Sequence, residues 1–140
     1  MASPAVYDAI RAYLEANWQG CLLVFENEGF DQGQQEDPWV YVEIIGTAWD
    51  QHSIGAGAVR DNRWEEFGII MFHLFVQEGK GTSVIRSNAY GLADLFRGLE
   101  LLTGTLTFER FSLGGGEAGS DDKKWWRTTA TIEWERKAAA

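Results

Sequence analysis

The sequence is poor in residues that support redox chemistry, metal binding and acid–base catalysis. Its 140 residues include one cysteine and two histidines. The single thiol, Cys21, cannot form an internal disulfide, and no group of cysteines and histidines has the spacing of a metal site. We therefore expect no disulfide, no metal and no cofactor. A lone cysteine also favours a reducing compartment such as the cytoplasm.

Basic residues are also scarce. Twelve lysines and arginines stand against 21 aspartates and glutamates, which gives a formal net charge of −9. Tight nucleic-acid binding needs a surplus of positive charge to neutralise phosphates, so this balance argues against it. An acidic surface remains compatible with DNA passing by without sticking, because like charges repel.

Long hydrophobic segments and a targeting signal are missing as well. The longest apolar stretch, Gly68 to Val76 interrupted by His73, is far shorter than the ~20 residues of a membrane helix. The first residues contain neither a positively charged segment nor an apolar run, so we expect no signal peptide and no membrane association.

The remaining composition is that of one ordinary folded domain. Apolar residues make up 45% of the chain, and 140 residues are enough for one hydrophobic core. Residues 1–140 are therefore expected to form a single domain. Ser3-Pro4 is a typical helix start, with a hydroxyl N-cap followed by proline. Apolar residues at helical spacing then predict a first helix up to Trp18, with Gly20 as the stop.

Alternation and turn residues divide the rest of the chain. The pattern predicts strands over 21–25, 39–47, 64–77, 105–113 and 124–136, and a second helix after Gly79-Lys80-Gly81-Thr82. Loops are expected near 27–37, 49–63 and 114–124, and residues 137–140 as a frayed tail. The order helix, three strands, helix, two strands predicts an α+β domain. Its mixed or antiparallel sheet of about five strands would have both helices packed on one face.

The strand predicted over 64–77 is apolar on both faces. Phe67, Ile69 and Met71 alternate with Ile70 and Phe72, so both sides of the sheet need cover at this strand. The two helices can cover one side. A neighbouring subunit is a candidate for the other.

Few residues are candidates for chemistry. His52 lies near Asp50 and Ser53, but triad partners converge in space and this stretch lacks a nucleophile elbow, so a solvated loop histidine is favoured. The segment around Lys80 departs twice from a phosphate-binding loop, and its glycines are better explained by a tight strand-to-helix turn. Glu65-Glu66 point to opposite faces of a strand and cannot chelate a cation together, so solvated charge is expected.

Three further residues are ambiguous. His73 is flanked by apolar residues, which favours a packed or interfacial histidine over a ligand. Cys21 has no nearby cation that would lower its pKa, so a core thiol is expected. In Trp125-Trp126 one ring must face the core and the other must face outward, where it could anchor a partner protein or be covered by Lys124 or Arg127.

The chain resembles the tail terminator, or tail completion, proteins of long-tailed bacteriophages and related phage-derived particles such as gene transfer agents. Three segments carry the resemblance. They are the opening helix followed by Val24-Phe25-Glu26-Asn27, the acidic loop that ends in Pro38-Trp39-Val40-Tyr41-Val42, and the stretch from Phe67-Gly68-Ile69-Ile70 through Glu78-Gly79-Lys80-Gly81 to Leu92-Ala93-Asp94-Leu95-Phe96. Together they span roughly residues 5–97. The segment containing Trp125-Trp126 departs from the pattern.

This resemblance implies a structural virion protein and not an enzyme. Such a protein would form a ring, typically a hexamer, that is assembled in the host cytoplasm and lies at the head-proximal end of the tail. Its expected partners are further copies of itself, the tail tube protein and a head-completion protein, with DNA passing through the ring. The ring would end tube growth and provide the head–tail joining surface.

The two long loops are the expected contact regions. The interface residues that we predict, mostly in or beside these loops, are Trp49, Arg60, Arg63, Trp64, His73, Lys123 and Trp125. Two alternatives remain open from the same virion, a head–tail connector component or a tube subunit. A small α+β ligand-binding domain or enzyme is a third alternative, which would need a concave site with convergent polar groups.

Overall fold

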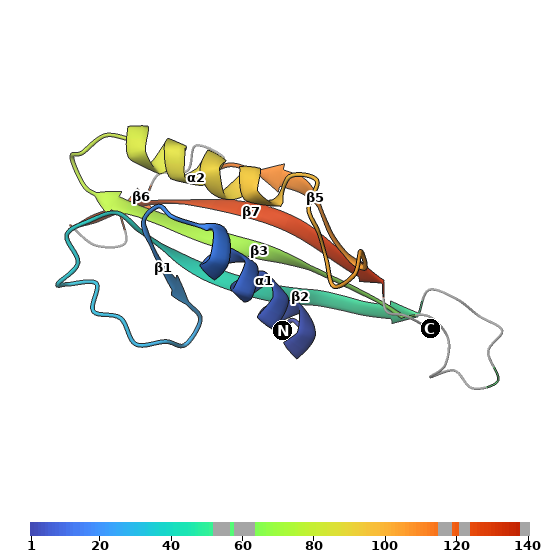
Figure 1. Ribbon diagram of the computed structural model, residues 1–140. Coiled ribbons are helices and arrows are strands. Elements are labelled where there is room, and N and C mark those ends of the chain that lie inside the picture. Colours follow the sequence, from blue (N-terminus) through green and yellow to red (C-terminus); the bar gives the residue numbers. More distant parts are fainter. Residues whose placement is uncertain (52–56, 58–63, 115–118, 121–123, 138–140) are drawn as a thin grey trace.

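The computed structural model describes residues 1–51, 57, 64–114, 119–120 and 124–137 (Figure 1). The described elements, in chain order, are α1 (Pro4–Asn17), β1 (Leu22–Phe25), β2 (Trp39–Gln51), β3 (Trp64–Gln77), α2 (Ser83–Phe96), β4 (Glu100–Leu101), β5 (Leu106–Ser112), β6 (Gly119–Ser120) and β7 (Trp125–Lys137). No helix in these ranges is both long and apolar enough to cross a membrane.

All strands of the described ranges join one mixed sheet. Its order is β1-β2-β3-β7-β5-β4, and β6 pairs with β7 beside β5. β1 runs parallel to β2 along Trp39 to Val42, and all other pairs are antiparallel. β2, β3 and β7 are 13, 14 and 13 residues long and form the centre of the sheet.

The α+β fold class and the order of the main elements are confirmed. The five expected strands correspond to β1, β2, β3, β5 and β7, and the two additional strands, β4 and β6, have two residues each. Three boundaries were wrong. β2 continues to Gln51 because it pairs with β3 as far as Trp64, so Trp49 lies in a strand and not in a loop. Residues 119–120, expected within a loop, pair with β7. Lys137, expected in a frayed tail, is the last residue of β7 because it pairs with Glu65 of β3.

Both helices lie on one face of the sheet and enclose the main core (Figure 1). Each presents one apolar stripe at helical spacing, which explains why these segments are stable as helices only against the sheet. The buried residues of α1 are Val6, Ile10 and Leu14, and those of α2 are Ile85, Ala89, Leu92, Ala93 and Phe96. They pack against the alternate residues of β2, β3 and β7 that point to the same side.

The start of α1 is anchored differently from the expectation. Ser3 occupies the N-cap position, but its side chain makes no capping bond to the helix. Its hydroxyl and its backbone N–H donate to the two carboxylate oxygens of Glu66, each at 2.7 Å. The hydroxyl therefore ties the helix to β3 instead of capping it.

The turn between β3 and α2 requires glycine. Gly79 and Gly81 have φ values of +87° and +75°, a region that other residues adopt at a cost. The backbone N–H of Lys80 donates to the carbonyl of Gln77 across the turn. These glycines build a tight strand-to-helix connection, as predicted.

Candidate protein-interaction surfaces

The face of the sheet opposite the helices, here called the open face, is only partly covered. In the middle of β3, the side chains on the helix side are at most 1% exposed: Ile70, Phe72 and Leu74. Those on the open face are half-buried: Phe67, Ile69, Met71 and His73. The strand is apolar on both faces, as predicted, but within the described ranges only one face is fully buried.

His73 lies in the middle of the open face and bridges three strands. Its Nε2 atom is 2.5 Å from Glu43 Oε1 on β2, and its Nδ1 atom is 3.1 Å from Thr129 Oγ1 on β7. The ring of Tyr41 packs beside it, with ring centroids 5.9 Å apart. Both ring nitrogens are therefore engaged within the chain, and the predicted role of His73 at an interface stays a prediction.

One end of the open face has a second, aromatic core. Trp39 stacks on Phe75 with ring centroids 4.1 Å apart, and Trp125 meets Trp39 edge-on at 6.0 Å. Phe30, from the loop before β2, covers Trp39 at 4.5 Å. Trp125 is only 1% exposed, so in the isolated chain its ring belongs to this core.

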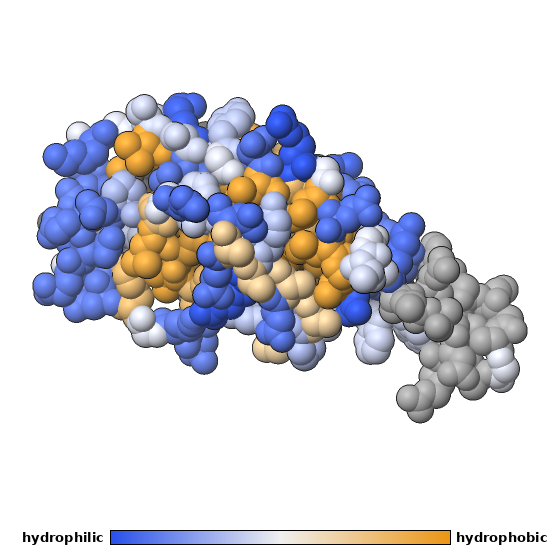
Figure 2. All heavy atoms as spheres, in the orientation of Figure 1, coloured by the Kyte–Doolittle hydropathy of each residue, from blue (hydrophilic) through white to orange (hydrophobic). Residues whose placement is uncertain are grey.

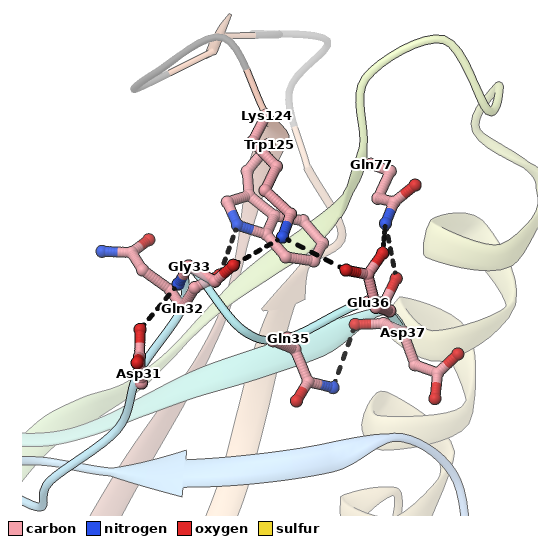
Figure 3. Close-up of polar contacts among 9 residues, drawn as sticks. All are labelled: Asp31, Gln32, Gly33, Gln35, Glu36, Asp37, Gln77, Lys124 and Trp125. Carbon is pink, nitrogen blue, oxygen red and sulfur yellow. Dashed lines mark hydrogen bonds and ion pairs between the residues drawn. The ribbon is translucent and has the colours of Figure 1, made fainter.

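Polar contacts hold the loop at 31–37 over this aromatic core (Figure 3). The indole N–H of Trp125 donates to the carbonyl of Gln32 at 3.2 Å, and the ammonium group of Lys124 donates to the carbonyl of Gly33 at 3.0 Å. The side-chain amide of Gln77 donates to both the carbonyl and the carboxylate of Glu36 at 2.9 Å. The loop predicted near 27–37 is thus held by residues at the ends of β3 and β7.

An exposed aromatic pair lies at the other end of the sheet. Trp49 and Trp64 pack with ring centroids 5.6 Å apart, and Trp49 is 70% exposed. Trp49 is paired with Glu66 across the β2–β3 ladder, so its backbone is fixed while its ring faces solvent. The other predicted interface residues, Arg60, Arg63 and Lys123, lie outside the described residues.

A hollow of about 470 Å³ lies between α1, β1 and residues 28–30. Arg11 lines it, with its guanidinium carbon 4.3 Å from the centroid of the Phe25 ring. The same guanidinium is 2.8 Å from a carboxylate oxygen of Glu28 and 3.1 Å from one of Glu15. The hydrogen bonds that Arg11 donates to Glu28 and Tyr7 raise the pKa of Arg11, and the bond to Glu28 lowers the pKa of Glu28. The hollow was not predicted, because its shape depends on how α1 packs beside β1 and residues 28–30.

Cys21 lines the same hollow. Burial raises the pKa of its thiol to about 11, so the thiol is protonated and unreactive near neutral pH. The half-buried environment agrees with the predicted packed thiol.

Acidic residues gather on the open face, at the end of the sheet away from the aromatic core. Glu109, Glu133 and Glu135 line a hollow of about 290 Å³. Burial, followed by a hydrogen bond with Glu109 and repulsion from Glu65, raises the pKa of Glu135. This face is therefore acidic as well as partly apolar.

The expectation that Glu65-Glu66 is solvated charge was wrong. Glu65 is only 5% exposed, and Glu66 accepts the two hydrogen bonds from Ser3. The two side chains do point to opposite faces, as strand alternation requires. Glu66 therefore anchors the start of α1, and Glu65 is buried on the open face.

The candidates for chemistry do not form a site within the described ranges. His52 and Ser53 lie outside them, and Asp50 is an exposed residue of β2. No three histidine, cysteine or acidic side chains of the described part are grouped as metal ligands would be. Within the described residues, the distinctive features are therefore the half-buried apolar side chains of the open face, the hollow beside β1 and the exposed ring of Trp49.

Comparison with known proteins identifies the family. A solved structure with 14% sequence identity matches the fold with a TM-score of 0.67, covering 100% of this chain and 99% of that chain. No curated protein sequence gives a match. The family model for phage tail terminator proteins matches residues 5–134, nearly the whole chain. The chain therefore belongs to the phage tail terminator family and is a structural component of a bacteriophage tail.

Proposed function

We propose that this protein forms a ring, a hexamer in our expectation, at the head-proximal end of the tail tube. There it ends tube polymerisation and offers the surface to which the head is joined. The observation that carries this proposal is the family match over residues 5–134. The half-buried apolar side chains of the open face support it, because a surface of this kind gains free energy when a partner covers it.

The mechanism that we propose is steric and involves neither catalysis nor a cofactor. One side of the ring would match the end of the tube, and the other side would not accept a further tube subunit. The predicted partners are therefore other copies of this chain, the tail tube protein and a head-completion protein. DNA would pass through the ring, and the net charge of −9 disfavours tight binding of its phosphates.

Tube growth in vitro tests the proposed role. Tail tube protein of the same particle is allowed to polymerise with increasing amounts of this protein, and tube lengths are measured by electron microscopy. We expect shorter tubes with this protein only at the ends. Incorporation along the whole tube would identify a tube subunit instead. Unchanged lengths, with the protein bound only to heads, would identify a connector component.

A further inference from the structure

We infer that each copy of this chain contacts the next through two different surfaces, with Trp49 of one copy entering the hollow between α1, β1 and residues 28–30 of the next. The inference rests on the proposed ring and specifies the two surfaces that form each joint. One surface is the hollow, and the other is the exposed aromatic pair Trp49 and Trp64.

The hollow has the size and lining of a receptor for an aromatic side chain. Its volume of about 470 Å³ lies in the usual range of binding pockets. Its walls include Leu14 and Phe25 of the core, together with Trp18 and Phe30, which are partly buried. Leu22 at its edge is 47% exposed although it belongs to a strand. Figure 2 shows hydrophobic atoms gathered on this face over β1, beside α1.

Trp49 is suited to be the inserted side chain. Among the described residues the exposed large hydrophobic side chains are Met1, Leu22, Trp49, Val84 and Tyr90. Trp49 is the largest of them, and tryptophan is enriched among residues that dominate binding energies. Its backbone is fixed in β2 and its ring rests against Trp64, so little conformational freedom is lost on docking.

The rim of the hollow can also satisfy the polar atom of tryptophan. A buried indole N–H needs an acceptor. The side chains of Glu15 and Glu28 are 58% and 38% exposed at this rim, and both are oriented by Arg11. Either carboxylate offers a free lone pair to an incoming N–H.

The two surfaces cannot meet within one molecule. The hollow adjoins β1, which pairs with the first residues of β2 up to Val42, whereas Trp49 lies seven residues further along the same strand. Seven residues of a strand span about 23 Å. Contact must therefore be between copies. In a heterologous contact, the copy that supplies Trp49 keeps its own hollow free, and the copy that supplies the hollow keeps its own Trp49 free. Repetition of such a contact closes into a ring or continues as a filament.

Two single substitutions and a control test the joint. Trp49→Ala removes the inserted ring, and Leu22→Glu places a charge at the edge of the hollow. Both positions are exposed, so the fold should be kept, which circular dichroism checks. Tyr90→Ala on α2 is the matched control, because Tyr90 is 63% exposed and lies outside both surfaces. By native mass spectrometry we expect rings from the wild type and Tyr90→Ala. Each of the other variants should associate roughly 30-fold more weakly.

Mixing the two variants gives the decisive result. The Trp49→Ala copy retains an intact hollow and the Leu22→Glu copy retains an intact tryptophan, so one joint can form between them. We expect one-to-one pairs that do not grow further. Rings from either variant alone, or a mixture that stays monomeric while the wild type forms rings, would overturn this joint and leave the proposed ring standing. A wild type that never self-associates would overturn both.

Discussion

The two faces of the central sheet are formed by the same strands but differ in how completely the chain buries them. Facing the helices, Ile70 and Phe72 of β3 are at most 1% exposed within a continuous core. On the open face, Ile69 and Met71 of the same strand are half-buried among acidic residues. The chain thus completes one face by itself and only part of the other. The difference shows that, within the described residues, apolar surface remains accessible on the open face and not in the core under the helices.

The largest expected effect is a difference in the free energy of unfolding between substitutions on the two faces of β3. Phe72→Ala should lower the free energy of unfolding by about 3–5 kcal/mol, because it leaves a cavity in a closed core. Met71→Ala, one residue away, removes a half-buried side chain and should cost about 1 kcal/mol. Urea denaturation measures both. Equal losses would mean that the open face is as well packed as the covered one.

The anchor of α1 gives the next largest effect. Glu66→Gln should lower stability by about 1–3 kcal/mol, because a carboxylate that accepts two hydrogen bonds from Ser3 is replaced by an amide with one acceptor. Glu133→Gln is the control, since Glu133 is half exposed and makes only a long ion pair with Arg110. Similar denaturation midpoints for the two variants would contradict the anchoring role.

The aromatic core allows a smaller, matched comparison. Trp125 donates a hydrogen bond to Gln32, whereas the buried indole N–H of Trp39 has no hydrogen-bond partner among the described residues. Trp125→Phe should therefore cost about 1 kcal/mol more than Trp39→Phe. Hydrogen exchange at residues 31–37 should also increase in the Trp125 variant alone. Equal losses of stability and equal hydrogen exchange in the two variants would show that the hydrogen bond from Trp125 to Gln32 does not hold the 31–37 loop.

The smallest effect concerns pH. The pKa of Glu135 is raised in the folded chain, mainly by burial, so the folded state binds its proton more tightly than the unfolded state does. The stability from this group is present below its unfolded pKa and is lost as pH rises through the raised value. Glu135→Gln should therefore stabilise the protein at pH 7 more than at pH 4. Thermal melting at the two pH values measures this, and a larger gain at pH 4 would refute it.

Much of the fold could be predicted because local patterns and tertiary burial agree. β3 begins at Trp64 and ends at Gln77 as expected, because its apolar run is long and bounded by turn residues. Glycine at 79 and 81 indicated the turn that their positive φ values require. The parallel pairing of β1 with β2 could not be predicted, since alternation in a short strand does not specify its direction.

Less of the interaction surfaces could be predicted. Alternation required one ring of Trp125-Trp126 to face each side, but could not show that Phe30 and the 31–37 loop bury the ring of Trp125. Phe30, the single aromatic residue in a polar loop, was the available signal. The hollow beside β1 is lined by residues between Arg11 and Phe30, but its shape depends on how α1 packs beside β1, which the local pattern does not specify. Trp49 and Trp64 were predicted as interface residues, and that role stays a prediction.

The most direct test of the central claim is the mass of the purified protein over a wide concentration range, combined with negative-stain images of large species. If the protein is a ring-forming tail terminator, mass should move from monomer to one closed species of uniform subunit number, and images should show rings that also cap tube ends. Open filaments of indefinite length would contradict a terminator and favour a tube subunit. A strict monomer that also fails to bind tube ends would contradict the account altogether.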